Sequence, residues 1–146
     1  MVVRAPNCVF CDIVADDRPA EVVFQSGDVV AFLDQRPLFP GHTLVVPRDH
    51  VDTLVDLPHA LVEPLFGAVQ ILAGAVRDAM HADGSFVALN NVVSQSVPHL
   101  HVHVVPRRRK DGLRGFFWPR NKYESDDEMA RVADAIRDAV ARVTTA

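Results

Sequence analysis

The sequence predicts an α+β domain built on a five-stranded antiparallel sheet with two main helices. Short strand-like runs separated by turn residues, and two longer stretches with helical periodicity between and after them, support this prediction. The 146 residues suit one domain, since domains cluster near about 100–150 residues. We expect a single domain over residues 1–146, with a core at about 8–107 and a C-terminal extension whose helix covers about 125–143.

The first half of the chain predicts three strands. Residues 21–25 and 28–34 are β-rich runs joined by a Ser-Gly turn, which is typical of a hairpin. A loop rich in proline follows them. Residues 43–46 then predict a buried strand that ends at a proline.

The first long helix is predicted from an apolar stripe between Leu65 and Met80. Pro64 is expected near its start, because a proline in the interior would delete a hydrogen bond. Gly67 and Gly74 lie two turns apart on one face. This spacing indicates either close contact with another backbone or simply tolerated glycine.

The second half predicts two more strands, at 85–90 and 98–106, and a C-terminal helix. Ser125 and Glu128 form a capping box that begins this helix at about 125–143. Its apolar stripe contains Met129, Val132, Ala133, Ile136, Val140 and Val143.

Composition and charge exclude several classes of function. The net charge of −4 gives no global basic field that would attract nucleic acid or anionic lipid. The most apolar stretch, residues 60–76, is shorter than the ~20 residues of a spanning helix. The N-terminus lacks the basic and then apolar segments of a signal peptide. We therefore expect a cytoplasmic protein with no nucleic-acid or membrane partner.

Residues 98–106 carry the most informative pattern, three histidines that alternate with apolar residues. Side chains on a strand alternate between faces, so His99, His101 and His103 are expected on one face. The outer two would lie ~13 Å apart at Cα, whereas an imidazole nitrogen reaches roughly 5 Å and a zinc bond adds about 2 Å. All three cannot bind one metal, so at least one is left for other work.

Imidazole chemistry suits attack on an anionic phosphorus centre. Histidine titrates near about pH 6.5, so a neutral ring can act as nucleophile or base beside a protonated one. The preceding residues 94–96, Ser-Gln-Ser, supply donors for phosphate oxygens. The basic run at 107–110 either attracts anionic substrates or forms a solvated turn.

Cys8 and Cys11 form a C-x-x-C pair near the N-terminus. The pair is a redox motif, half of a zinc site, or two unrelated buried thiols. No strand precedes it, as a thioredoxin-type motif would require. The seven histidines of the chain offer the remaining ligands, which favours zinc.

These residues resemble the histidine triad family of nucleotide hydrolases and transferases over roughly residues 8–107. Such a resemblance implies a five-stranded sheet with two helices, paired as a homodimer with a continuous ten-stranded sheet. The matching segments are Phe32-Leu33-Asp34, Pro40-Gly41-His42, residues 44–50, Gln95-Ser96-Val97 and the alternating histidines.

The resemblance implies a purine nucleotide site. His101 would attack the α-phosphate and form a covalent nucleotidyl-histidine, while His103 would contact the phosphate and orient His101. Asp34 would bind the ribose hydroxyls. His42 would be the additional active-site histidine.

The loop before the histidines departs from the family pattern. Gln95 and Ser96 match positions near the scissile phosphate and leaving group. The family has a glycine-containing loop after its asparagine, but residues 90–95 are shorter and contain no glycine. Either Asn90 or Asn91 could then contact the phosphate, and we expect Asn90. Because this contact is undecided, the sequence also leaves the leaving-group preference open.

By the same resemblance, Cys8, Cys11, His50 and His99 would bind a structural Zn²⁺. Two cysteines and two histidines give the four ligands of a closed structural site. The metal would then support the catalytic strand and leave His101 free to react.

The expected activity is cleavage at the α-phosphate of an adenosine 5'-phosphoramidate or another AMP-linked substrate. The alternatives are a dinucleoside polyphosphate hydrolase, a non-catalytic nucleotide-binding scaffold, and a hydrolase with a catalytic metal. His103 argues against the uridylyltransferase branch, which typically has glutamine there. Trp118 is expected over the pocket, at the dimer seam or in the core.

Overall fold

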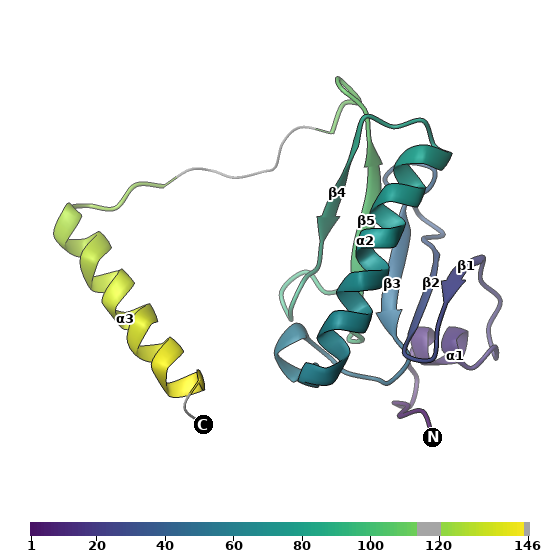
Figure 1. Cartoon of the computed structure of the whole chain (residues 1–146), viewed down its shortest axis with the longest axis horizontal. Coiled ribbons are helices and arrows are strands. Elements are labelled where there is room, and N and C mark those ends of the chain that lie inside the picture. The colour runs from purple at the N-terminus through teal and green to yellow at the C-terminus, as the bar shows by residue number, and fades with distance from the viewer. Residues whose placement is uncertain (114–120, 145–146) are drawn as a thin grey trace. The chain divides into compact units, whose positions relative to one another are not determined.

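The computed structural model describes residues 1–113 and 121–144. It forms two compact units, Met1–Asp111 and Gly112–Ala146. The first unit holds every strand that the described residues form, and the second holds one helix (Figure 1). Trp118 lies outside the described residues, so its role stays a prediction.

A five-stranded sheet forms the centre of the first unit. Its spatial order is β1-β2-β3-β5-β4, and all neighbouring strands are antiparallel. This confirms the predicted α+β class and the β1–β2 hairpin. The strands are β1 (Val22–Gln25), β2 (Val29–Leu33), β3 (Thr43–Pro47), β4 (Gly84–Ala88) and β5 (Val102–Arg107).

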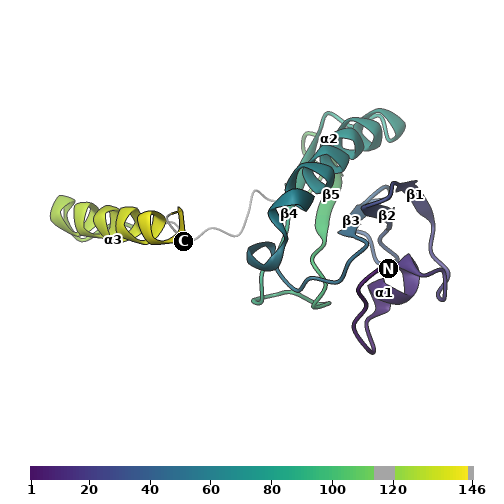
Figure 2. The same ribbon diagram turned by 60° about the horizontal axis from the view of Figure 1, so that its bottom comes forward.

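Helices lie on opposite faces of this sheet (Figure 2). The long helix α2 (Val62–Ala79) packs its predicted stripe, including Leu65, on one face. The six-residue helix α1 (Val9–Val14) packs Phe10 on the other. Residues of β2 and β3 are therefore buried on both sides. The sequence did not predict α1, because six residues are too few to show a helical period.

The start of α2 agrees with the sequence. Pro64 is its third residue, where no intrahelical N–H bond is needed. A Cβ added to Gly67 or Gly74 would meet no atom within 4 Å, so within the described residues both are tolerated glycines. Residues His59–Ala79 are long and apolar enough to cross a membrane by length and composition, a test that core helices also pass. The buried face of α2 contacts the sheet, as in a core helix.

The strand predicted at 98–106 begins later than expected, at Val102. Leu100, Val102 and Val104 do face the core under α2. The histidine face is covered as well: His99 is 0% and His101 3% exposed. The reason is α1, whose Phe10 ring contacts His101 edge-on at a centroid distance of 5.0 Å. The strand thus has two buried faces, where the alternation predicted one.

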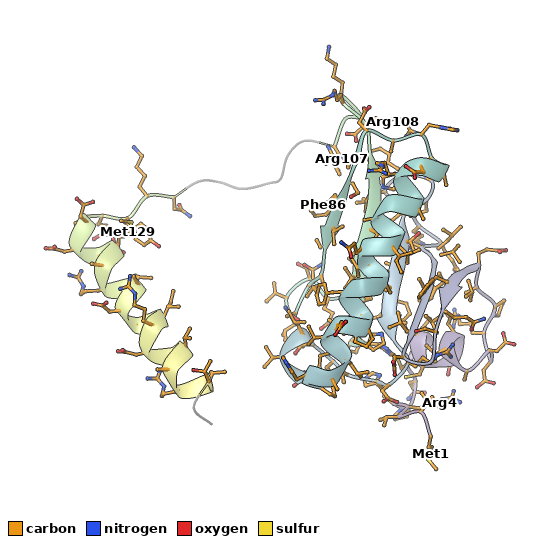
Figure 3. The ribbon with its side chains drawn as sticks, in the orientation of Figure 1. Met1, Arg4, Phe86, Arg107, Arg108 and Met129 are labelled. Carbon is orange, nitrogen blue, oxygen red and sulfur yellow. The ribbon has the colours of Figure 1, made fainter. Side chains whose placement is uncertain are left out.

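The second unit contains α3 (Asp126–Thr144), close to the predicted range. The Ser125 hydroxyl accepts a hydrogen bond from the Glu128 N–H at 3.1 Å, which confirms this cap. The Glu128 carboxylate accepts from the Glu124 N–H, one residue before the partner a capping box uses. Within this unit the apolar stripe of α3 is exposed, including Met129 (Figure 3).

We expect Leu65→Ala to lower the free energy of unfolding by about 2–5 kcal/mol, because Leu65 is fully buried between α2 and the sheet. Urea denaturation measures this change. Arg77→Ala on the same helix is the control, because 52% of the Arg77 side chain is exposed. Equal losses for both variants would contradict the assigned packing.

Candidate active site and metal site

Four predicted metal ligands meet at one point beneath α1. The ligand atoms of Cys8, Cys11, His50 and His99 all lie within 4.8 Å of one another. The Cys11 Sγ is 3.3 Å from His50 Nδ1 and 3.6 Å from His99 Nδ1, and the Cys8 Sγ is 3.5 Å from His99 Nδ1. Three separate segments supply these ligands: α1 with its N-cap, the turn after β3, and the approach to β5.

Hydrogen bonds fix both histidines of this cluster in the form that binds a metal. The His99 Nε2–H donates to the Pro47 carbonyl at 2.9 Å, and the His50 Nε2–H donates to Asp52 at 2.7 Å. The Nδ1 lone pair of each ring is therefore available to bind a metal in the cluster. Burial lowers the pKa of His99 to about 4, so its ring is neutral. A Cys₂His₂ set whose imidazoles both turn Nδ1 toward the cluster fits zinc.

A second set of predicted residues lines a cavity of about 350 Å³. His101 and His103 come from β5 and its approach, Asp34 follows β2, and Ser96 lies in the loop before the triad. The opposite wall is apolar and was not identified from the sequence. It consists of Val9, Phe10 and Ile13 from α1, with Phe32, Leu33 and Leu44 from the sheet.

Backbone groups set the proton positions on the imidazoles of the cavity. The His101 Nδ1–H donates to the His99 carbonyl at 2.8 Å, which leaves the Nε2 lone pair of His101 free to react. The Leu38 N–H donates to His42 Nδ1 at 3.1 Å, so the proton of His42 lies on Nε2. That Nε2–H donates to His103 Nδ1 at 2.9 Å, and His103 keeps its own proton on Nε2.

This chain of bonds also decides what the group of Asp34, His42 and His103 can do. Their ligand atoms lie within 4.8 Å, close enough to hold a metal. However, the Leu38 N–H occupies the Nδ1 lone pair of His42, so its Nε2 carries a proton. A protonated nitrogen cannot bind a metal. His42 and His103 therefore form a hydrogen-bond relay, and the Asp34 carboxylate lies 3.7 Å from His42 Nε2, beyond hydrogen-bond distance.

Burial lowers the pKa of His101 and His103 in the cavity and of His42, which is bonded to His103. The pKa of His103 falls to about 4, with His101 and His42 as further causes. The sequence predicted a protonated ring beside a neutral one at neutral pH. The structure favours neutral rings for both His101 and His103 in the free protein, because they are buried together.

The loop before the triad holds the remaining predicted residues. The Gln95 side chain donates to the Asp52 carbonyl and accepts from the Val92 N–H, while Ser96 lines the cavity. Asn90 donates to the Ser94 carbonyl at 3.2 Å. Asn91 accepts from the Leu54 N–H at 2.8 Å. The side chains of both asparagines and of Gln95 thus form hydrogen bonds to backbone groups. Their predicted contacts with substrate stay predictions.

Two residues of this loop have a left-handed backbone without being glycine. The φ angles are 66° at Val92 and 62° at Ser94. A β-branched residue is strained in this region, and such strain is concentrated at functional sites. The loop therefore adopts left-handed backbone at two positions without glycine, at an energetic cost.

The basic run after β5 forms a turn. The Arg107 guanidinium pairs with Asp111 at 2.6 Å, and Arg108 donates to the Met80 carbonyl (Figure 3). The Arg109 N–H donates to the Asp83 carboxylate at 2.9 Å. These contacts support the structural interpretation of the run.

Comparison with known proteins identifies the class to which this fold and site belong. Residues 15–110 match the HIT domain family. The protein hit of Bacillus subtilis is 35% identical over 140 residues, 94% of each chain. The adenylylsulfatase HINT3 of Arabidopsis thaliana is 28% identical over 138 residues, 90% of this chain and 68% of that protein.

A solved structure also resembles this chain. A Zn-bound histidine triad family protein from Mycobacterium smegmatis is 37% identical, with a TM-score of 0.70, and the match covers 92% of this chain and 97% of that one. The chain belongs to the histidine triad (HIT) family. The zinc-bound relative and the four-ligand cluster together point to zinc.

Zinc removal should lower stability. We expect the Cys11→Ser variant to lose bound zinc and to unfold at least about 5 °C lower, because the cluster joins α1 to the segments around β3 and β5. Elemental analysis and thermal unfolding measure both effects. His59→Ala alters a histidine outside the cluster and should retain the metal. Full zinc content in Cys11→Ser would exclude this ligand set.

The rate of substrate cleavage should stay constant from about pH 8 down to the ordinary histidine range near 6.5. The predicted nucleophile, His101, must be neutral to react, and burial lowers its pKa. Protonation therefore stops the reaction only at lower pH. A profile of kcat/KM against pH tests this expectation, and a loss of rate already centred at or above pH 6.5 would contradict it.

Proposed function

We propose that the protein cleaves nucleotides at the α-phosphate through a covalent nucleotidyl intermediate on His101. One observation carries this proposal: the bond from His101 Nδ1 to the His99 carbonyl leaves an unprotonated Nε2 at a nucleotide-sized cavity. Neutral imidazole is a competent nucleophile. The family, which comprises nucleotide hydrolases and transferases, supports this class of reaction.

The cavity offers groups that can contact the base, the ribose and the phosphate of a nucleoside monophosphate. Phe10 and Phe32 offer an apolar wall for the base, and the Asp34 carboxylate is placed to accept from ribose hydroxyls. The His103 Nε2–H and the Ser96 hydroxyl can donate to phosphate oxygens. The relay through His42 keeps the His103 proton on the nitrogen that donates.

The proposed reaction has two displacements. His101 Nε2 forms a bond to phosphorus as the bond to the leaving group breaks, and the leaving group departs with the bonding electron pair and takes a proton from solvent. Water, or another acceptor, then attacks phosphorus, loses a proton and releases His101 with its lone pair restored. Zinc supplies structural support in this scheme, because its ligand His99 carries the carbonyl that orients His101.

We propose adenosine 5'-phosphoramidates or related AMP-linked compounds as substrates. The naming of a relative as an adenylylsulfatase supports an AMP-linked class. A dinucleoside polyphosphate hydrolase and a nucleotide-binding scaffold are the alternatives. A faster rate on a diadenosine polyphosphate than on an adenosine phosphoramidate would identify the dinucleoside polyphosphate hydrolase. Nucleotide binding without product release would identify the scaffold.

We also propose a homodimer with a ten-stranded sheet. Within the described residues β4 is an edge strand, paired only with β5. The neighbouring helix α2 exposes Phe66 and Ile71, which a second copy would cover. Analytical ultracentrifugation tests the assembly.

His101→Ala should lower turnover of an adenosine phosphoramidate by roughly a thousandfold or more, since no other group supplies the nucleophile. Rapid quench into an alkaline denaturant, in which the nitrogen–phosphorus bond survives, should show radiolabelled nucleotide bound to the wild-type protein and none bound to the variant. His59→Ala, which lies outside the cavity, is the control. Unchanged turnover in His101→Ala would exclude the mechanism.

A further inference from the structure

We infer that a second cavity beside the catalytic one receives the leaving group and favours leaving groups that carry a positive charge. This inference rests on the proposed function and assigns the leaving-group preference that the sequence leaves open. The cavity measures about 360 Å³ and is lined by Asn7, Asp52, Ser96 and Val97, with Cys8 and His50 of the metal cluster.

The two cavities share a wall. Ser96, Val97 and Val9 line both of them. In the proposed complex the phosphate lies at Ser96 and His101, and the nucleoside extends toward Asp34 within the first cavity. The group bonded to the other side of phosphorus must then leave this cavity past Ser96. The second cavity is the space that begins there.

The charges of the two cavities differ in sign. Arg18 and Arg36 line the catalytic cavity together with Asp34. In the described part of the chain, no lysine or arginine lines the second cavity, which carries the Asp52 carboxylate. A side chain amine on the leaving group would be attracted to this carboxylate, and a phosphate, sulfate or carboxylate would be repelled.

The surroundings leave the charge of Asp52 available. Its side chain is 63% exposed, and it accepts a hydrogen bond from the Nε2–H of His50, whose ring faces the metal cluster with Nδ1. The nearby Arg4 is held by two carboxylates, Asp12 at 3.1 Å and Asp17 at 3.0 Å. Arg4 does not line the cavity.

Asn7 also lines this cavity and allows a charge change opposite in sign to that of Asp52→Asn. Its φ of 59° is left-handed, a conformation that asparagine and aspartate both tolerate. Asn7→Asp therefore adds one negative charge with little change of shape. Asp52→Asn removes one and keeps an oxygen that can accept from His50.

The test uses three AMP amidates of similar length, made from ethylenediamine, propylamine and β-alanine, whose free ends are cationic, neutral and anionic. For wild type, kcat/KM should fall in that order. The cationic-to-anionic ratio should rise about fivefold in Asn7→Asp and fall about fivefold in Asp52→Asn at low salt, and both effects should shrink at high salt. Comparing variants on the same substrates cancels the intrinsic reactivity of each amine.

Asp28→Asn, in the turn between β1 and β2 and outside both cavities, is the charge-matched control and should keep the wild-type ratio. Zinc content is measured for each variant. If Asp52→Asn loses its metal, the kcat/KM ratio of Asn7→Asp alone decides the test. Turnover with a ratio that none of the variants changes would overturn this subsite. No turnover of any amidate by wild type would instead overturn the proposed function.

Discussion

The hydrogen bond from the His101 Nδ1–H to the His99 carbonyl joins the two halves of the site. On one side, His99 binds the cluster through Nδ1 and holds the Pro47 carbonyl through Nε2. On the other, His101 is turned so that its reactive nitrogen meets the cavity. The backbone at position 99 is thus fixed by two side-chain bonds of the same residue. A single peptide carbonyl transmits that rigidity to His101, the proposed nucleophile.

Much of the fold could be predicted from sequence because it rests on periodicity. The stripe of α2 shows a helical period that matches the face it buries, and the strands are short β-rich runs bounded by turn residues. The division of the triad could also be predicted, since strand geometry prevents His99 and His103 from reaching one metal. The metal ligand set was found by resemblance, and the structure brings its members together.

Other features depend on contacts between distant segments and leave no local pattern. The proton positions on His42 and His99 are set by backbone groups of residues 38 and 47, which only the folded register brings near. The neutral state of His101 follows from Phe10 and α1 covering it, and α1 is too short to show a period. A C-x-x-C pair that contains Phe10 and is followed by Ile13 was the available clue.

Helix α1 has contacts of different kinds along its short length. Its N-cap and third residue contribute sulfur to the metal cluster, while Phe10 and Ile13 line the cavity proposed to bind a nucleotide. Six residues make too little helix to persist unaided. A metal that orders α1 therefore lowers the entropy cost of ordering it when a nucleotide binds, and a nucleotide does the same for the metal. Metal affinity and nucleotide affinity should be thermodynamically coupled with positive sign, each ligand strengthening the other by an equal factor.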